Sequence, residues 1–237
     1  MKLDVLAFGA HPDDVELSCS GTLSKLKKQG KKVGIIDLTE GEMGTRGTIE
    51  TRYSEAAEAS SVIGLDAREN LNIGDGVFEI NHQNKLLVIE AIRKYRPEIV
   101  FANAIDDRHP DHPRAAELVK QALFLAGLSK IKTFDNGVEQ AAHRPKHLFH
   151  YIQFYHIKPD FVVDISNEME TKMKSILAYK TQFFDPNSTE PKTMISSSKF
   201  LDFVDARAKE MGGSIEVDYG EGFTCDRPLP YNLLNIL

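Results

Sequence analysis

Residues Leu3 to Ala10 read L-D-V-L-A-F-G-A, and the polar turn His11-Pro12-Asp13-Asp14 follows them directly. The apolar run shows no period of 3.6 residues, which indicates a strand that is buried on both of its faces. A helix with an apolar face is expected after the turn, at 15–29, and Gly30 is its predicted stop. A strand, a polar turn and a helix at the start of the chain are typical of an α/β protein.

The same alternation extends outward from this stretch. Further strands are expected at 32–38, 70–73, 98–102, 147–157 and 161–165, and further helices at 49–63, 85–95, 113–125, 167–179 and 197–211. Strands that alternate with helices predict a Rossmann-like α/β fold, a mostly parallel twisted sheet with helices on both faces. We find no linker and no internal repeat, and therefore expect a single domain over residues 1–237.

Composition narrows the class of protein. The formal net charge is −6, so no global basic field exists to attract nucleic acid or an anionic membrane, and we expect neither as a partner. There are only two cysteines, too few for a disulfide framework, and no segment approaches the ~18 apolar residues of a membrane span. The opening apolar run is too short for a signal peptide. These features predict a reduced, cytoplasmic protein.

Two polar motifs each follow a predicted parallel strand. The first is Gly9 to Asp14, G-A-H-P-D-D, and the second is Asp106 to His112, D-D-R-H-P-D-H. In a sheet of order 3-2-1-4-5, strands one and four are neighbours, and their carboxyl ends flank the crevice where ligands bind. The two motifs are therefore expected to meet.

Three histidines and several carboxylates in one crevice would be costly, because the carboxylates repel one another and every group loses water. A divalent cation resolves this cost, and imidazole and carboxylate ligands suit zinc with three protein ligands. His11, one of Asp13 or Asp14, and His112 meet that description, and the remaining carboxylate can act as general base. Either motif alone could be a polar turn or a charged surface loop, whereas both together favour a metal site.

A dinucleotide site is the alternative that the fold suggests. It requires glycines where the chain approaches a pyrophosphate, but His11 and two aspartates occupy those places. Asp37 at the end of the second strand resembles a ribose-binding residue, but without the glycines we interpret it as structural. The sequence therefore argues against dinucleotide binding.

The two motifs strongly resemble those of the PIG-L-like family of zinc-dependent sugar de-N-acetylases. Leu38 to Gly44, Arg52 with Glu55-Ala56, and Tyr219 to Phe223 agree with this resemblance, which runs from Leu3 to about Phe223. It looks closest to bacterial members that deacetylate N-acetylglucosaminyl malate in bacillithiol biosynthesis. The resemblance thus implies a metal-dependent hydrolase acting on a linear amide bond.

Carried over to this chain, the family pattern makes His11, Asp14 and His112 the ligands of one Zn²⁺ per chain, although another divalent metal could serve. It makes Asp13 the general base. Spacing alone distinguishes neither Asp13 from Asp14 nor His109 from His112.

The resemblance also implies roles around the reacting group. His109 would be a cationic group beside the developing oxyanion, with Asp111 as its orienting partner. Arg52 and Arg108 match positions that hold the substrate or the product acetate.

We expect a small-molecule amino-sugar substrate, with N-acetylglucosaminyl malate first, because local Arg52 and Arg108 favour a substrate with a carboxylate. The alternatives are a chitooligosaccharide, an N-acetylglucosaminyl inositol or a thiol conjugate. A non-catalytic sugar- or metal-binding protein is the rival of another class, but no ligand or base is missing. By resemblance, a homo-oligomer is expected, and the bacillithiol-type relatives form hexamers.

We assign no functional role to several other histidines and to Cys19. His143, His147 and His150 are not expected to form a second metal site, since His147 and His150 would point to opposite faces of a strand. Cys19 is expected to be a small buried residue. The sequence assigns no role to 130–145 or 185–200.

Overall fold

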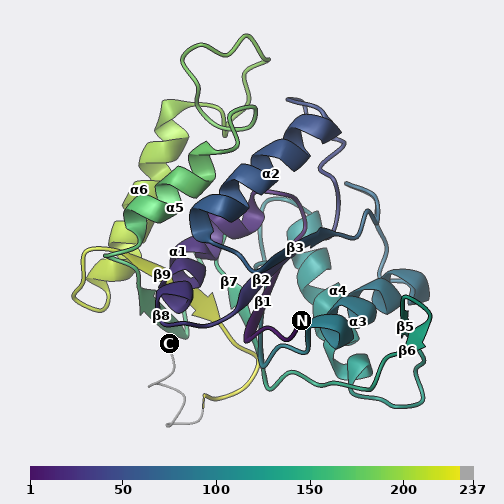
Figure 1. The fold of residues 1–237 in the computed structure, drawn as a ribbon. Coiled ribbons are helices and arrows are strands. Elements are labelled where there is room, and N and C mark those ends of the chain that lie inside the picture. The colour runs from purple at the N-terminus through teal and green to yellow at the C-terminus, as the bar shows by residue number, and fades with distance from the viewer. Residues whose placement is uncertain (230–237) are drawn as a thin grey trace.

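The computed structural model describes residues 1–229 (Figure 1). A seven-stranded sheet has the order β3-β2-β1-β4-β7-β9-β8. Its strands, in chain order, are β1 (Val5–Gly9), β2 (Val33–Asp37), β3 (Ala67–Asn70), β4 (Ile99–Ala102), β7 (His147–Tyr151), β8 (Phe161–Asp164) and β9 (Gly220–Thr224). A separate two-stranded hairpin consists of β5 (Phe134–Asp135) and β6 (Val138–Glu139).

Six helices cover the sheet in the described part of the chain: α1 (Asp14–Lys28), α2 (Ile49–Ile63), α3 (His82–Tyr95), α4 (Asp111–Ala126), α5 (Met169–Leu177) and α6 (Ser198–Gly213). Figure 1 shows α3 and α4 on one side of the sheet, and α1, α2, α5 and α6 on the other. Among these residues, no helix is both long and apolar enough to cross a lipid bilayer.

The sheet is mostly parallel, as the alternation of strands and helices predicts. Strands β3, β2, β1, β4 and β7 run parallel, whereas β9 is antiparallel to both β7 and β8. Strand β1 is buried on both faces: Leu6 and Phe8 pack in the cluster that includes α3 and α4, and Val5 and Ala7 pack in the cluster that includes α1. The Rossmann-like fold class is confirmed.

Several strands differ from the expectation. Strand β7 ends at Tyr151 and not at 157, and the β5–β6 hairpin was not expected. The third strand lies at Ala67–Asn70, not at 70–73, because an edge strand with the polar sequence A-R-E-N gives no apolar signal. Strand β9, G-E-G-F-T, was not expected because glycine weakens a strand pattern. Gly220 is needed there, since a Cβ atom at this position would lie 2.9 Å from the backbone nitrogen of Gly212.

Helix α1 is interrupted at Cys19, whose φ of −144° is not helical. Glu221 accepts hydrogen bonds from the backbone N–H groups of Gly21 and Thr22, and Lys172 donates to two carbonyl groups of the preceding turn. The Lys172 Nζ and Glu221 Oε1 atoms lie 2.7 Å apart, and both side chains are almost fully buried. This ion pair satisfies the backbone groups that the interruption frees.

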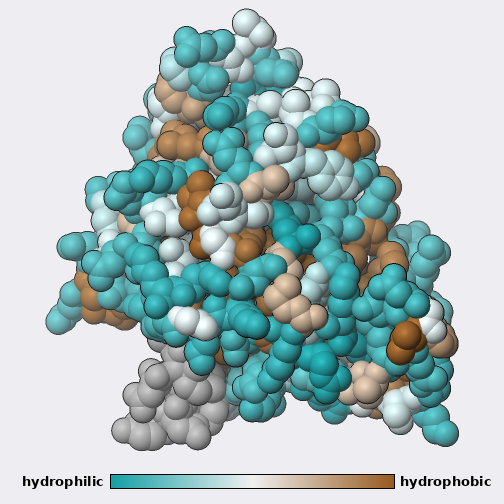
Figure 2. Space-filling view, viewed as in Figure 1, coloured by the Kyte–Doolittle hydropathy of each residue, from teal (hydrophilic) through white to brown (hydrophobic). Residues whose placement is uncertain are grey.

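The face of the molecule in Figure 2 is largely hydrophilic, with apolar side chains in separate groups. Ordinary soluble domains also expose scattered apolar residues, so these groups do not by themselves mark an interface. The expectation of a homo-oligomer therefore remains a prediction.

Candidate metal centre and active site

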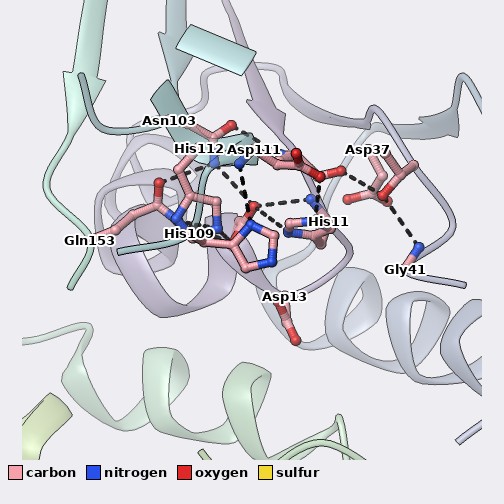
Figure 3. Close-up of polar contacts among 12 residues, drawn as sticks. His11, Asp13, Asp37, Gly41, Asn103, His109, Asp111, His112 and Gln153 are labelled. Carbon is pink, nitrogen blue, oxygen red and sulfur yellow. Dashed lines mark hydrogen bonds and ion pairs between the residues drawn. The ribbon is translucent and has the colours of Figure 1, made fainter. Parts of the chain in front are cut away.

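The two polar motifs meet at the carboxyl ends of β1 and β4, which are neighbouring parallel strands. The ring centroid of His11 lies 4.7 Å from that of His109 and 5.6 Å from that of His112. The His109 and His112 rings stack with centroids 5.1 Å apart (Figure 3). Residues almost a hundred positions apart in sequence therefore form one cluster, as the strand order predicts.

Asp14 lies between two of these histidines. Its Oδ2 atom is 3.5 Å from Nδ1 of His11, and its Oδ1 atom is 3.1 Å from Nε2 of His112. All three side chains are largely buried. Two imidazole nitrogens and a carboxylate facing one another form the donor set that zinc takes at catalytic sites. The residues present therefore fit a divalent cation.

Each of these two histidines has a further carboxylate on its other ring nitrogen. Asp75 Oδ1 lies 2.9 Å from His11 Nε2, and Asp107 Oδ1 lies 2.9 Å from His112 Nδ1. Metal-binding histidines commonly donate their second N–H to a carboxylate, which fixes the ring and its tautomer. Among residues 1–229, no carboxylate makes such a contact with His109. This pattern distinguishes His11 and His112 from His109.

Sequence reasoning did not find these outer carboxylates. Asp107 stands within the second motif, but nothing in the spacing separates its role from that of its neighbours. Asp75 lies in the loop after β3, where only the flanking Gly74 and Gly76 signal a turn. Its place beside His11 results from the fold.

Donor atoms lie within 4.8 Å of one another in two groups, His11 with His109 and His112, and His11 with Asp75 and Asp111, and Asp14 is in neither of them. The outer carboxylates distinguish His109 from the other two histidines of the first group, so the second group is the remaining alternative to the set with Asp14. Two observations favour the set with Asp14. Asp111 already pairs with the Arg114 guanidinium and accepts a hydrogen bond from the Gly76 N–H. The His11–Asp75–Asp111 group also contains only one imidazole, whereas the set with Asp14 contains two.

The predicted role of Asp111 is wrong in its detail. Its carboxylate points to His11 Nε2, at 3.4 Å, and to Arg114, and not to the ring of His109. The backbone N–H of Asp111 instead donates to Nδ1 of His109 over 3.3 Å. Asp111 is the first residue of α4, so its backbone N–H is free of helical bonding and available for this contact.

His109 is also less prone to carry charge than predicted. Burial lowers its pKa, and the neighbouring His11 and His112 lower it further. With Nδ1 accepting the Asp111 N–H, the Nε2 atom of a neutral ring bears the proton. His109 is therefore suited to donate a hydrogen bond as a neutral imidazole.

The backbone conformation of Asp13 distinguishes it from Asp14. Its φ of 115° lies in the left-handed region, which non-glycine residues rarely adopt, and such strain concentrates at functional sites. Its Oδ2 atom accepts a hydrogen bond of 3.1 Å from Arg52. Burial raises the pKa of Asp13 to about 7 despite the opposing effect of Arg52. A carboxylate with this pKa can take up a proton near neutral pH.

The two arginines that the sequence singled out lie in different surroundings. Arg52 is only 6% exposed and faces Asp13, so it holds that carboxylate. Gly41, with a φ of +69°, leaves room for the Arg52 guanidinium, because a Cβ atom there would lie 2.6 Å from it. Arg108 is exposed, and its guanidinium lies 5.0 Å from the centre of the Phe154 ring.

A cavity of about 260 Å³ connects this cluster with helix α6. All of the predicted site residues except Asp111 line it, together with apolar residues of α6 such as Phe200 and Val204. Ile195 from the unassigned segment 185–200 also borders the cavity. In contrast, the hairpin in 130–145 packs on α3, away from the site.

Three further histidines, Cys19 and Asp37 lie outside the proposed ligand set. Within residues 1–229, neither group of side chains that could hold a cation includes His143, His147 or His150. Cys19 is fully buried, and Asp37 pairs with Arg68 through two hydrogen bonds. The structural interpretation of Asp37 is thereby supported.

Comparison with known proteins decides the family. Residues 6–123 match the family model PIG-L, described as GlcNAc-PI de-N-acetylase. Diacetylchitobiose deacetylase from Thermococcus kodakarensis is 30% identical over 190 residues, which cover 76% of this chain and 70% of that protein. The chain belongs to the PIG-L family.

Solved structures agree with this assignment. The conserved protein TT1542 from Thermus thermophilus is 38% identical, with a TM-score of 0.86 over 97% of each chain. N,N'-diacetylchitobiose deacetylase from Pyrococcus horikoshii is 27% identical, with a TM-score of 0.78 over 97% of this chain and 85% of that one. As a member of the PIG-L family, the protein is a metal-dependent hydrolase that acts on an amide bond.

Proposed function

We propose that this PIG-L protein removes the acetyl group from an N-acetylglucosamine-containing small molecule and holds a zinc ion on His11, Asp14 and His112. The observation that carries the proposal is the convergence of these three side chains beside Asp13 in one cavity. Another divalent metal with similar ligand preferences could replace zinc.

The bound cation would acidify a water molecule and polarise the acetamide carbonyl group. Asp13 receives the proton of the attacking water, and Arg52 keeps the Asp13 carboxylate in place. The Nε2–H group of His109 donates a hydrogen bond to the oxygen on which negative charge develops, a type of contact typically worth about 3–4 kcal/mol. Asp13 then returns the proton to the leaving amine, and acetate departs.

The test is amine release from N-acetylglucosamine conjugates by the purified protein, before and after treatment with a chelator. The proposal expects activity that a chelator removes and added zinc restores. Metal bound at one equivalent per chain without any amine release would instead support the non-catalytic binding protein.

Two N-acetylglucosamine conjugates are candidates for the substrate. The named activity of the Thermococcus and Pyrococcus relatives supports N,N'-diacetylchitobiose. The position of Arg108 at the cavity, with Arg207 also in its lining, supports a substrate with a carboxylate such as N-acetylglucosaminyl malate. Both share the acetamide on which the metal centre would act.

A substrate panel separates them. We would compare kcat/KM for N-acetylglucosaminyl malate, its inositol counterpart, N,N'-diacetylchitobiose and a thiol conjugate. An Arg108→Gln variant should lose activity selectively on the malate conjugate if Arg108 binds the carboxylate. Equal losses on the malate and inositol conjugates would contradict that role.

A further inference from the structure

Two buried amides, Asn103 and Gln153, lie beside the proposed metal centre outside both polar motifs. Asn103 follows β4 directly, and Gln153 lies two residues beyond the end of β7. Asn103 is fully buried and Gln153 is 8% exposed. Figure 3 shows both side chains on the His112 side of the ring cluster, away from Asp13.

The backbone fixes how each amide is turned. Asn103 Oδ1 accepts the N–H of Ala10 at 3.0 Å, and Gln153 Oε1 accepts the N–H of Ala104 at 3.1 Å. Asn103 Nδ2 also donates to Gln153 Oε1 at 3.0 Å. Because the oxygens are held by donors, the two amide nitrogens must face the other way.

Both nitrogens point at Asp14. Asn103 Nδ2 donates to Asp14 Oδ2 and Gln153 Nε2 donates to Asp14 Oδ1, each over 3.0 Å. The backbone N–H of His11 adds a third hydrogen bond, of 2.9 Å, to Oδ2. A carboxylate has about four acceptor positions, so one position remains besides these three hydrogen bonds. It belongs to Oδ1, which also lies 3.1 Å from His112 Nε2.

We propose that Asn103 and Gln153 are positioning residues that hold the Asp14 carboxylate so that it offers one lone pair, on Oδ1, to the cation. Because both amides donate to the Asp14 side chain, they connect the carboxyl ends of β1, β4 and β7. This inference rests on the proposed ligand set of His11, Asp14 and His112.

The experiment measures zinc affinity by competition with a chromophoric chelator, for the wild type and for Gln153→Met and Asn103→Ser. We expect each substitution to weaken zinc binding about 10- to 100-fold, the usual effect of losing an outer partner of a ligand. With cobalt in place of zinc, the visible absorption bands should weaken, because a freed carboxylate can bind through both oxygens and raise the coordination number.

Gln182→Met is the matched control. Gln182 is a buried glutamine that lines the same cavity, but its Nε2 atom donates to the backbone of Arg46 and does not contact Asp14. Its substitution should leave zinc affinity and the cobalt spectrum unchanged. A merely structural role of Gln153 would lower thermal stability in the same way as this control without changing affinity.

Zinc affinity within threefold of the wild type in Gln153→Met would overturn the inference, even if Asn103→Ser did not fold. Asp14→Asn, measured in the same assay, distinguishes failure of the proposed ligand set from failure of the positioning role. If Asp14→Asn keeps wild-type affinity, the ligand set itself is wrong. If Asp14→Asn loses zinc and Gln153→Met keeps it, only the positioning role fails.

Discussion

The neighbouring aspartates Asp13 and Asp14 make different contacts at this site because the backbone turns between them. Asp13, with φ 115°, faces Arg52 across the cavity, while Asp14 begins α1 and faces two histidines. The left-handed conformation of Asp13 is unfavourable by about 1–3 kcal/mol for a residue with a side chain, and it persists only where the surroundings enforce it. The proposed roles of Asp13 as base and Asp14 as ligand therefore depend on the backbone conformation of Asp13.

Replacing the proposed base, Asp13, tests these roles. Asp13→Asn should lower kcat by about 10²- to 10⁴-fold, because general base catalysis contributes that much, and should leave zinc bound. The assay is amine release together with metal analysis of the same sample. Asp106→Asn, an exposed substitution at the first residue of the second motif, serves as the control. Full activity in Asp13→Asn would refute its role as base.

Asp75 and Asp14 should differ in their effect on the metal. Asp14→Asn removes a ligand and should abolish stoichiometric zinc binding, whereas Asp75→Asn removes only the partner of His11 Nε2. The latter should weaken affinity about 10- to 100-fold. Chelator competition measures both. The opposite order of effects would favour the alternative group of His11, Asp75 and Asp111.

At the scale of elements, helix α1 begins at the proposed ligand Asp14 and is interrupted farther along, at Cys19. The Lys172–Glu221 pair connects α5 and β9 to that break, and its atoms complete the hydrogen bonds of the interrupted turn. A buried pair contributes little net stability when both partners are present, because each charge has lost its water. Its hydrogen bonds connect the interrupted part of α1 to α5 and β9.

Removing one partner of the Lys172–Glu221 pair should therefore destabilise the folded protein. Lys172→Met leaves Glu221 buried and uncompensated, and should reduce the free energy of unfolding by about 3–5 kcal/mol. Urea denaturation followed by circular dichroism measures this change. Lys174→Met on the same helix removes only an exposed pair with Glu170 and should have no measurable effect. Similar results for the two variants would contradict the role assigned to the buried pair.

At the scale of the whole molecule, the proposed cation would link loops from distant parts of the chain and so stabilise the native state. Zinc at a free concentration about a thousandfold above its Kd should add about 4 kcal/mol. For a domain of this size, that corresponds to a rise in Tm of about 8–16 °C. Scanning calorimetry with and without a chelator measures it. The Asp14→Asn variant should show no such shift, and a chelator-insensitive wild type would argue against metal binding in the folded state.

Much of the fold could be predicted from local pattern. The apolar runs of β1 and β2 and the boundaries of α2 agree with the structure because these strands are buried on both faces and the helix has clear end signals. Edge strand β3 and glycine-rich β9 gave weak patterns. Their positions depend on pairing with neighbours, which no window of sequence contains.

The same division applies to the site. The sequence by itself determined that His11, Asp14, His109 and His112 would gather at one end of the sheet, since chain order fixes which parallel strands are neighbours. Only the tertiary structure decided that Asp75 and Asp107 support the two histidines, that Asp111 faces His11, and that Asn103 and Gln153 hold Asp14. Those contacts join side chains from separate strands and loops, and their distances are set by packing in three dimensions.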